Sequence, residues 1–284
     1  MSSMEKNIEE ILEVLKAKAV VLSEMLKERL AGYSDINNAS GDHVLKIDMK
    51  ADLLFGEALK TLKCVKGYVS EEQPNFVDVN KDASLIVTFD PLDGSSLVDS
   101  NLSIGSIFGI YEGGLKGENL VTALYFIYGP RLELVVAKKE AKHYVYVDKE
   151  WKFIQDFKME SKGKLNSPGG TQKYWDKKHK ELIDSFFARG YRLRYSGGMV
   201  ADLHQILCKK GGIFSYPATS DAKSGKLRIL FEVFPFAFIY EKAGGEASDG
   251  KKRLLDIEVP SLHASTPCFF GSKVEMKEVS DVYR

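Results

Sequence analysis

The chain has 284 residues, 44% of them hydrophobic and 28% charged, as in an ordinary globular protein with a large core. Basic and acidic residues number 40 each, so no net field attracts nucleic acid or a membrane surface, and anions must be bound by local clusters. Three widely separated cysteines fit neither a disulfide framework nor a metal site. With no apolar signal core and no run of ~18 apolar residues, we expect a cytoplasmic protein.

Two amphipathic helices are predicted first. Apolar residues recur at steps of three and four from about Asn7, and Gly32 is expected to end that helix because glycine readily adopts a left-handed cap. A second helical pattern starts at Met49, with Asp48 as a natural N-cap. Capping alone accounts for Asp48 when the residue is considered locally.

A buried strand over residues 85–89 then leads into Asp90-Pro91-Leu92-Asp93-Gly94-Ser95-Ser96. We expect the strand to stop at the proline. A turn there would direct Asp90, Asp93 and the Leu92 carbonyl toward one point, which provides the oxygen ligands that Mg²⁺ prefers. The amides that follow could bind a phosphate, helped by a helix N-terminus if one begins there. An Asp-Gly turn alone is common, but the complete heptad favours a site for metal and phosphate.

The rest of the first half is rich in strands. A strand over residues 65–69 ends at Glu71 and Glu72, and further strands are predicted at 104–111, 120–128, 132–138, 142–147 and 151–157. The polar segment 160–171 is the expected junction between two halves, 1–160 and 161–284, which pack as one unit.

The second half alternates between helices and strands, which favours a layered α/β architecture. Helices are predicted at 173–188, 198–208 and 229–243, and strands at 192–195 and 212–216. Pro235 is tolerated if it lies in the first turn of the last helix. Glu232 lies in an apolar run, where a carboxylate is costly unless a cation meets it. The five histidines are scattered without zinc-like spacing and are assigned no role.

Four stretches carry a family resemblance: residues 69–72, 89–96, 194–202, and 225–235 with 242–245. From about Ser40 onward the chain resembles the class I fructose-1,6-bisphosphatases, within the lithium-sensitive, metal-dependent sugar and inositol phosphatase superfamily. The heptad is typical of the superfamily, whereas Lys-Leu-Arg followed by Phe-Glu and Pro is specific to the bisphosphatases. The resemblance implies a layered α/β/α/β/α sugar phosphatase fold and Mg²⁺-dependent hydrolysis of fructose 1,6-bisphosphate in gluconeogenesis.

The resemblance also implies a role for each matching residue. Two or more Mg²⁺ ions, which Mn²⁺ could replace, would be held by Glu71, Asp90, the Leu92 carbonyl, Asp93 and Glu232. Asp48 and Glu72 would manage the attacking water. The phosphate that is cleaved would lie against Asp93, Gly94, Ser95 and Ser96, and the other end of the substrate would meet Asn166, Arg194, Tyr195, Tyr216, Lys226 and Arg228.

Some of these residues have simpler explanations without the resemblance. Tyr195 and Tyr216 would be packing residues, and Lys226 with Arg228 a solvated charge pair. In the family, Arg194 reaches a neighbouring subunit's site, which implies a homo-oligomer, at least a dimer and expected to be a tetramer.

The chain also departs from the family pattern. It is shorter before its first helix, and it has Asp82 and Glu118 where better-known members place basic residues around an AMP site, so we expect weak or no AMP inhibition. The loop 166–174 is longer and lacks an expected tyrosine. The alternative that the chain is a sedoheptulose 1,7-bisphosphatase or a dual-substrate enzyme therefore stays open. An inositol monophosphatase and a silent sugar-phosphate-binding regulator are the remaining alternatives.

Overall fold

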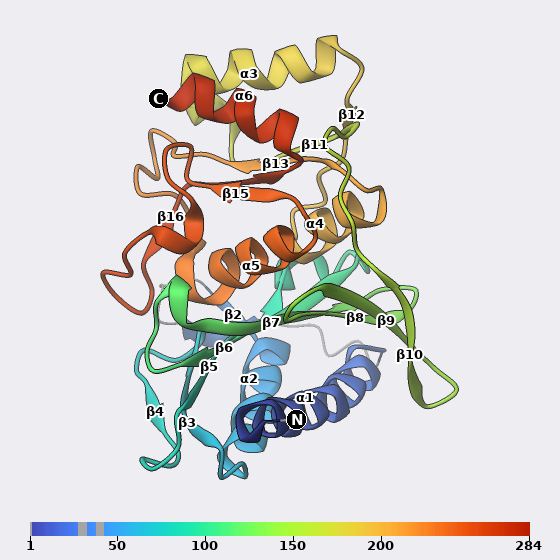
Figure 1. The fold of residues 1–284 in the computed structure, drawn as a ribbon, viewed down its shortest axis with the longest axis vertical. Coiled ribbons are helices and arrows are strands. Elements are labelled where there is room, and N and C mark those ends of the chain that lie inside the picture. The colour runs from blue at the N-terminus through green and yellow to red at the C-terminus, as the bar shows by residue number, and fades with distance from the viewer. Residues whose placement is uncertain (1, 28–32, 38–42) are drawn as a thin grey trace.

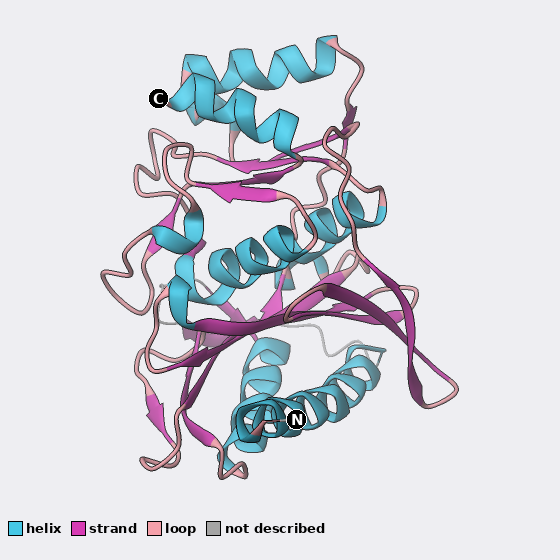
Figure 2. Cartoon of the chain, viewed as in Figure 1, coloured by secondary structure: helices cyan, strands magenta, loops and turns pink. Residues whose placement is uncertain are grey.

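The computed structural model describes residues 2–27, 33–37 and 43–284, and it has five stacked layers (Figures 1 and 2). Helices α1 and α2 cover one face of a large sheet, α4 and α5 lie between this sheet and a smaller one, and α3 and α6 cover the outer face of the smaller sheet (Figure 1). The predicted α/β/α/β/α fold is confirmed. None of the helices in the described part of the chain is both long and apolar enough to cross a membrane.

The element bounds are as follows. The helices are α1 (Ser3–Lys27), α2 (Lys46–Lys60), α3 (Lys177–Ala188), α4 (Met199–Cys208), α5 (Phe234–Lys242) and α6 (Lys273–Tyr283). The large sheet has the order β10-β9-β8-β7-β6-β5-β3-β4 and contains β3 (Val65–Ser70), β4 (Val77–Asp78), β5 (Leu85–Asp93), β6 (Ile104–Glu112), β7 (Leu120–Tyr128), β8 (Leu132–Ala137), β9 (Ala141–Val147) and β10 (Glu150–Asp156).

The smaller sheet has the order β12-β11-β13-β17-β15. Its strands are β11 (Leu165–Pro168), β12 (Arg192–Leu193), β13 (Gly212–Tyr216), β15 (Glu246–Ser248) and β17 (Cys268–Gly271). Two short pairs complete the strands, β1 (Tyr33–Asn37) with β2 (His43–Leu45), and β14 (Leu227–Arg228) with β16 (Ser265–Thr266).

Helix α1 begins earlier than its apolar stripe predicts. It starts at Ser3 because Ser2 and Glu5 form a capping box, in which the Glu5 amide donates to Ser2 Oγ (3.1 Å) and the Ser2 amide donates to Glu5 Oε2 (2.7 Å). The predicted cap at Gly32 lies outside the described residues.

The N-cap prediction for Asp48 is wrong. Strand β2 runs directly into α2, which begins at Lys46, so Asp48 lies inside the first turn and not before it. An acid is still favourable there because it faces the positive end of the helix dipole. Asp48 is buried.

The prediction that the central strand stops at the proline is also wrong. Strand β5 lies between β3 and β6 and continues to Asp93, with all nine residues buried. Its register against β6 shifts between Asp90 and Asp93, and this bulge accommodates Pro91, which has no amide hydrogen for the ladder. The bulge keeps the two acids on an ordered strand.

The segment 160–171, predicted as a polar junction, contains the buried strand β11. Its residues pair in parallel with β13 and include the buried polar side chains of Asn166 and Ser167. Because this segment is rich in polar residues, the sequence did not predict that it contains a strand of the smaller sheet.

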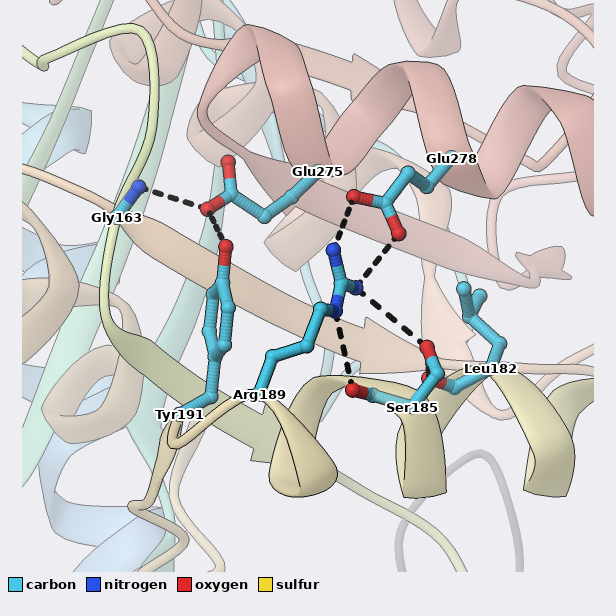
Figure 3. Close-up of polar contacts among 7 residues, drawn as sticks. All are labelled: Gly163, Leu182, Ser185, Arg189, Tyr191, Glu275 and Glu278. Atoms are coloured by element: carbon cyan, nitrogen blue, oxygen red, sulfur yellow. Dashed lines mark hydrogen bonds and ion pairs between the residues drawn. The ribbon is translucent and has the colours of Figure 1, made fainter.

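Polar contacts tie helix α6 to the C-cap of α3 and to residues just before β11 and β12 (Figure 3). The buried Glu275 Oε1 accepts from the Gly163 amide and from the Tyr191 hydroxyl, both at 2.7 Å, while Arg189 forms a bidentate pair with Glu278 at 2.9 and 2.7 Å. Glu275 and Glu278 both belong to α6, so their contacts hold this helix on the outer face of the smaller sheet. Glu275 is the fully buried one of the two acids.

Candidate active site

A cavity of about 450 Å³ lies where β3, β5, α4 and the segment before α5 meet. Most of the residues predicted for the site line it: Asp48, Glu71, Glu72, Asp90, Leu92, Asp93, Gly94, Ser95, Ser96, Tyr195, Tyr216, Lys226 and Glu232. Residues separated by up to 184 positions in the sequence therefore face one space.

Four carboxyl groups gather on one side of this cavity, and we call them the acid cluster: Glu71, Asp90, Asp93 and Glu232. Single oxygens of Asp90, Asp93 and Glu232 lie within 4.8 Å of one another, and these three residues are buried. Burial raises the pKa of Glu71 to about 7 and that of Asp93 to about 6. Burial, with repulsion from neighbouring acids, holds the pKa of Asp90 and of Glu232 well above the usual range.

Arg228 contacts two members of the acid cluster. Its Nε lies 3.8 Å from Glu71 Oε1, and its backbone amide donates to Glu232 Oε2 at 2.5 Å. One guanidinium cannot balance four carboxylates. The donor set contains only oxygens, and its charge is uncompensated, so the cluster fits hard divalent cations such as Mg²⁺.

The turn after Asp93 brings the backbone at Gly94 close to the backbone at Gly198. Gly94 has a φ of 76°, in the left-handed region that glycine adopts without strain, and a Cβ there would lie 3.2 Å from Gly198 Cα. Ser95–Leu97 forms one 3₁₀ turn, so the longer helix considered for this point is absent. Any phosphate here would therefore be bound by the amides of the turn itself.

Helix α4 approaches the same turn from the other half of the chain. The Met199 and Val200 amides donate to the two oxygens of Asp93, at 3.2 and 2.7 Å. These are first-turn amides, which have no partner within their own helix. Asp93 thus orients α4 while α4 orients Asp93.

Tyr195, Tyr216 and Lys226 also line the cavity. Both tyrosine rings lie close to Gly169, where a Cβ would come 2.5 Å from Tyr216 and 3.2 Å from Tyr195. Tyr195 is 45% exposed, more than a packing residue would be. Lys226 is exposed to solvent, so its charge is available to an anion.

Three predicted residues do not line the cavity. Asn166 is buried in β11, and its amide atoms have no hydrogen-bond partner among the described residues. Arg194 Nη1 donates to its neighbour's carbonyl, Leu193 O, at 2.7 Å. Arg228 contacts Glu71 and Glu232 of the acid cluster without lining the cavity itself.

Asp202 also lines the cavity, although the sequence reasoning gave it no role. Its two oxygens accept from the Ser196 amide at 2.8 and 3.1 Å, which shapes the segment leading into α4. Burial raises the pKa of Asp202 to about 6. The sequence signal that could have identified Asp202 is its position three residues after Met199, on the same face of the predicted helix.

Comparisons with known proteins agree with this geometry. Residues 2–156 match a family model described as Fructose-1-6-bisphosphatase, N-terminal domain, and residues 159–284 match one described as Fructose-1-6-bisphosphatase, C-terminal domain. The chain belongs to the fructose-1,6-bisphosphatase family.

Similar proteins cover nearly the whole chain. The class 1 fructose-1,6-bisphosphatase of Helicobacter hepaticus is 56% identical over 96% of this chain and 98% of its own length, and that of Campylobacter concisus is 50% identical over 98% and 99%. The crystal structure of Leishmania major fructose-1,6-bisphosphatase in holo form has a TM-score of 0.92 at 28% identity, covering 97% of this chain and 94% of its own. A Toxoplasma gondii structure, assigned provisionally as a sedoheptulose-1,7 bisphosphatase, has a TM-score of 0.90 at 27% identity, covering 100% and 95%.

Proposed function

We propose that this chain hydrolyses fructose 1,6-bisphosphate to fructose 6-phosphate and phosphate, as an enzyme of carbohydrate metabolism that serves gluconeogenesis in the cytoplasm. The observation that carries the proposal is the lining of one cavity. The acid cluster and the Gly94 turn line the same space as Lys226 and two tyrosines. A sugar bisphosphate has two phosphate groups, and this lining contains groups that can bind both: cations held by the acids for one, and Lys226 for the other. Membership of the family supports the same substrate.

The acid cluster and the Leu92 carbonyl are proposed to hold two or more Mg²⁺ ions, with Mn²⁺ as a substitute. When bound, these cations would neutralise the oxygens of the phosphate and make nearby water more acidic. The raised pKa values of the cluster support this assignment, since crowded acids that are buried or partly buried resist ionisation when no cation is near.

Chemistry at the phosphate is assigned to the chain's own groups. Asp48 in α2 and Glu72 at the end of β3 line the cavity, and either can take a proton from the attacking water and orient it. The amides of Gly94, Ser95 and Ser96 would bind the phosphate oxygens and keep the phosphorus in line with that water. Direct attack by water requires no covalent phosphoenzyme.

The distal phosphate would be recognised by a different part of the cavity lining. Lys226 provides a charge, and Tyr195 and Tyr216 provide hydroxyl groups. Asn166 is proposed to support the same contacts, because it lies in β11, three residues before Gly169, and its buried amide has no hydrogen-bond partner among the described residues.

Arg194 is proposed to serve the cavity of a second subunit, since it does not line the cavity of its own chain. The active unit is then a homo-oligomer, at least a dimer and in our proposal a tetramer. Hydrolysis of sedoheptulose 1,7-bisphosphate is the second candidate. The likeness to the Toxoplasma gondii structure favours it, because that protein shares the fold over the whole chain.

Replacement of a proposed ligand tests the site. We expect Glu71→Ala to abolish phosphate release in saturating Mg²⁺ while the variant keeps a cooperative unfolding transition, because Glu71 is only partly buried and is not part of the core. Glu118→Ala, an exposed acid in a surface turn, is the matched control and should retain wild-type activity. Normal turnover by folded Glu71→Ala would refute the assignment.

A further inference from the structure

A second group of metal-binding side chains lies outside the cavity. Glu133 on β8, His143 on β9 and His204 on α4 each offer one donor atom, and these atoms all lie within 4.8 Å of one another. None of the three lines the active-site cavity. We call this group the histidine cluster.

The backbone explains how residues so far apart in sequence come together. Strands β8 and β9 are antiparallel neighbours in which Glu133 pairs with Val145 and His143 pairs with Val135, so the two side chains are diagonal neighbours on one face. His204, on α4, packs against that face, where its ring meets Tyr125 and Phe157 edge to face. Side-chain periodicity alone does not bring these three residues together.

The donor atoms already converge on one point. Glu133 Oε2 lies 2.7 Å from His143 Nε2 and 3.1 Å from His204 Nε2. Tetrahedral zinc with bond lengths near 2.1 Å separates its ligand atoms by about 3.4 Å. Shifts of roughly half an ångström would therefore open space for an ion.

Groups around the histidine cluster orient the ligands. The Tyr125 hydroxyl contacts His204 Nδ1 at 2.8 Å, and Arg131 Nε donates to Glu133 Oε1 at 2.6 Å, which leaves Oε2 for the shared point. The His143 ring stacks on Phe157 with centroids 5.0 Å apart. Zinc-binding histidines and carboxylates characteristically have such supporting contacts.

A fourth donor follows one helical turn later. Cys208 is at the end of α4, and its Sγ lies 3.2 Å from His204 Nε2. Carboxylate, imidazole and thiolate together are typical zinc ligands and differ from the all-oxygen acid cluster.

We propose that the histidine cluster is a zinc site in which Glu133, His143 and His204 are ligands and Cys208 is the fourth. It would clamp the last turn of α4 to β8 and β9, while the first turn of the same helix holds Asp93. With Cys208 as the fourth protein ligand, no position is left open for a substrate, so the role of the zinc is structural. The proposal is independent of the sugar bisphosphatase assignment.

Zinc content and ligand identity test the proposal on the full-length protein. Protein stripped with a chelator should take up one Zn²⁺ per chain in excess Mg²⁺. Zinc-edge X-ray absorption should show two imidazole ligands, and Co²⁺ in place of zinc should give the charge-transfer absorption of a cobalt thiolate. His204→Gln should weaken zinc binding by about 100-fold or more, whereas His179→Gln, which removes a buried histidine from α3, should not.

The wild-type measurements decide the matter even if a variant fails to fold. No zinc retained in excess Mg²⁺, or zinc with oxygen ligands only, would overturn the proposal, because the acid cluster contains no histidine. Two imidazoles without the cobalt-thiolate absorption would keep the site and remove Cys208 from it.

Discussion

At the scale of single residues, the chemistry depends on acids placed where acids are costly. Glu232 could be identified from the sequence because it interrupts an apolar run, and Asp90 and Asp93 because they frame a turn. Asp202 has a weaker sequence signal, its spacing from Met199 on the predicted helix. Its contact with the Ser196 amide appears only in the folded chain.

The acid cluster should destabilise the metal-free protein. Its carboxyl groups have raised pKa values when folded, so stability is present at low pH and is lost as the pH rises from about 4.5 through those values. We expect Glu232→Gln, in chelator at pH 8, to raise the free energy of unfolding by roughly 1 kcal/mol or more. The gain should shrink at pH 5, because protonation of the wild-type carboxyl group, whose pKa is raised, removes the buried charge as the pH falls.

Urea unfolding in chelator at both pH values measures this difference. Glu118→Gln removes an exposed charge of the same sign and should change little. A loss of stability in Glu232→Gln at pH 8 would mean that the carboxylate is compensated without a cation.

At the scale of elements, hydrophobic periodicity predicted most of the strands from β5 to β10 and the interior of α4. It failed where a competing rule applied. Pro91 suggested a strand end, but a bulge absorbs it, and the polar residues of β11 suggested a loop, but their side chains are buried between layers. The contact between Asp93 and α4 joins positions 106 and 107 residues apart, so no local pattern encodes it.

The α6 contacts offer a matched pair of acids (Figure 3). Glu275→Ala should cost about 2–3 kcal/mol, because it leaves the buried Tyr191 hydroxyl and Gly163 amide without an acceptor. Glu278→Ala removes a pair at the surface and should cost less than about 1 kcal/mol. Denaturant titration gives both values, and KM should stay unchanged because α6 does not line the cavity. Equal costs would contradict the difference in burial.

At the scale of the whole molecule, the layer order could be predicted only through the family resemblance, since propensity does not determine how two sheets stack. The division into halves at residue 160 stays a prediction. The cavity draws on both sides of that boundary, so neither half carries the complete site.

Sharing of Arg194 between subunits predicts complementation. Asp93→Ala and Arg194→Ala should each lose activity. A refolded equal mixture should recover roughly a quarter of wild-type activity, because half of the dimers are hybrids and each hybrid has one intact site. No recovery in verified hybrids would place Arg194 within its own chain's site.

Regulation by AMP should be weak or absent. The family resemblance aligns the acids Glu118 and Asp82 with basic residues that better-known members place around an AMP site, and Glu118 is exposed in a surface turn. Titration of AMP against phosphate release tests this expectation. Strong inhibition at micromolar AMP would contradict it.

The most direct test of the central claim is phosphate release from three substrates side by side, with Mg²⁺ and with chelator. Our account predicts Mg²⁺-dependent release from fructose 1,6-bisphosphate, at a kcat/KM well above that for inositol monophosphate, because only a bisphosphate engages Lys226 and the two tyrosines while it meets the acid cluster. Sedoheptulose 1,7-bisphosphate shows whether the enzyme accepts the longer sugar. Release that is independent of divalent cations, or none from fructose 1,6-bisphosphate, would contradict the account.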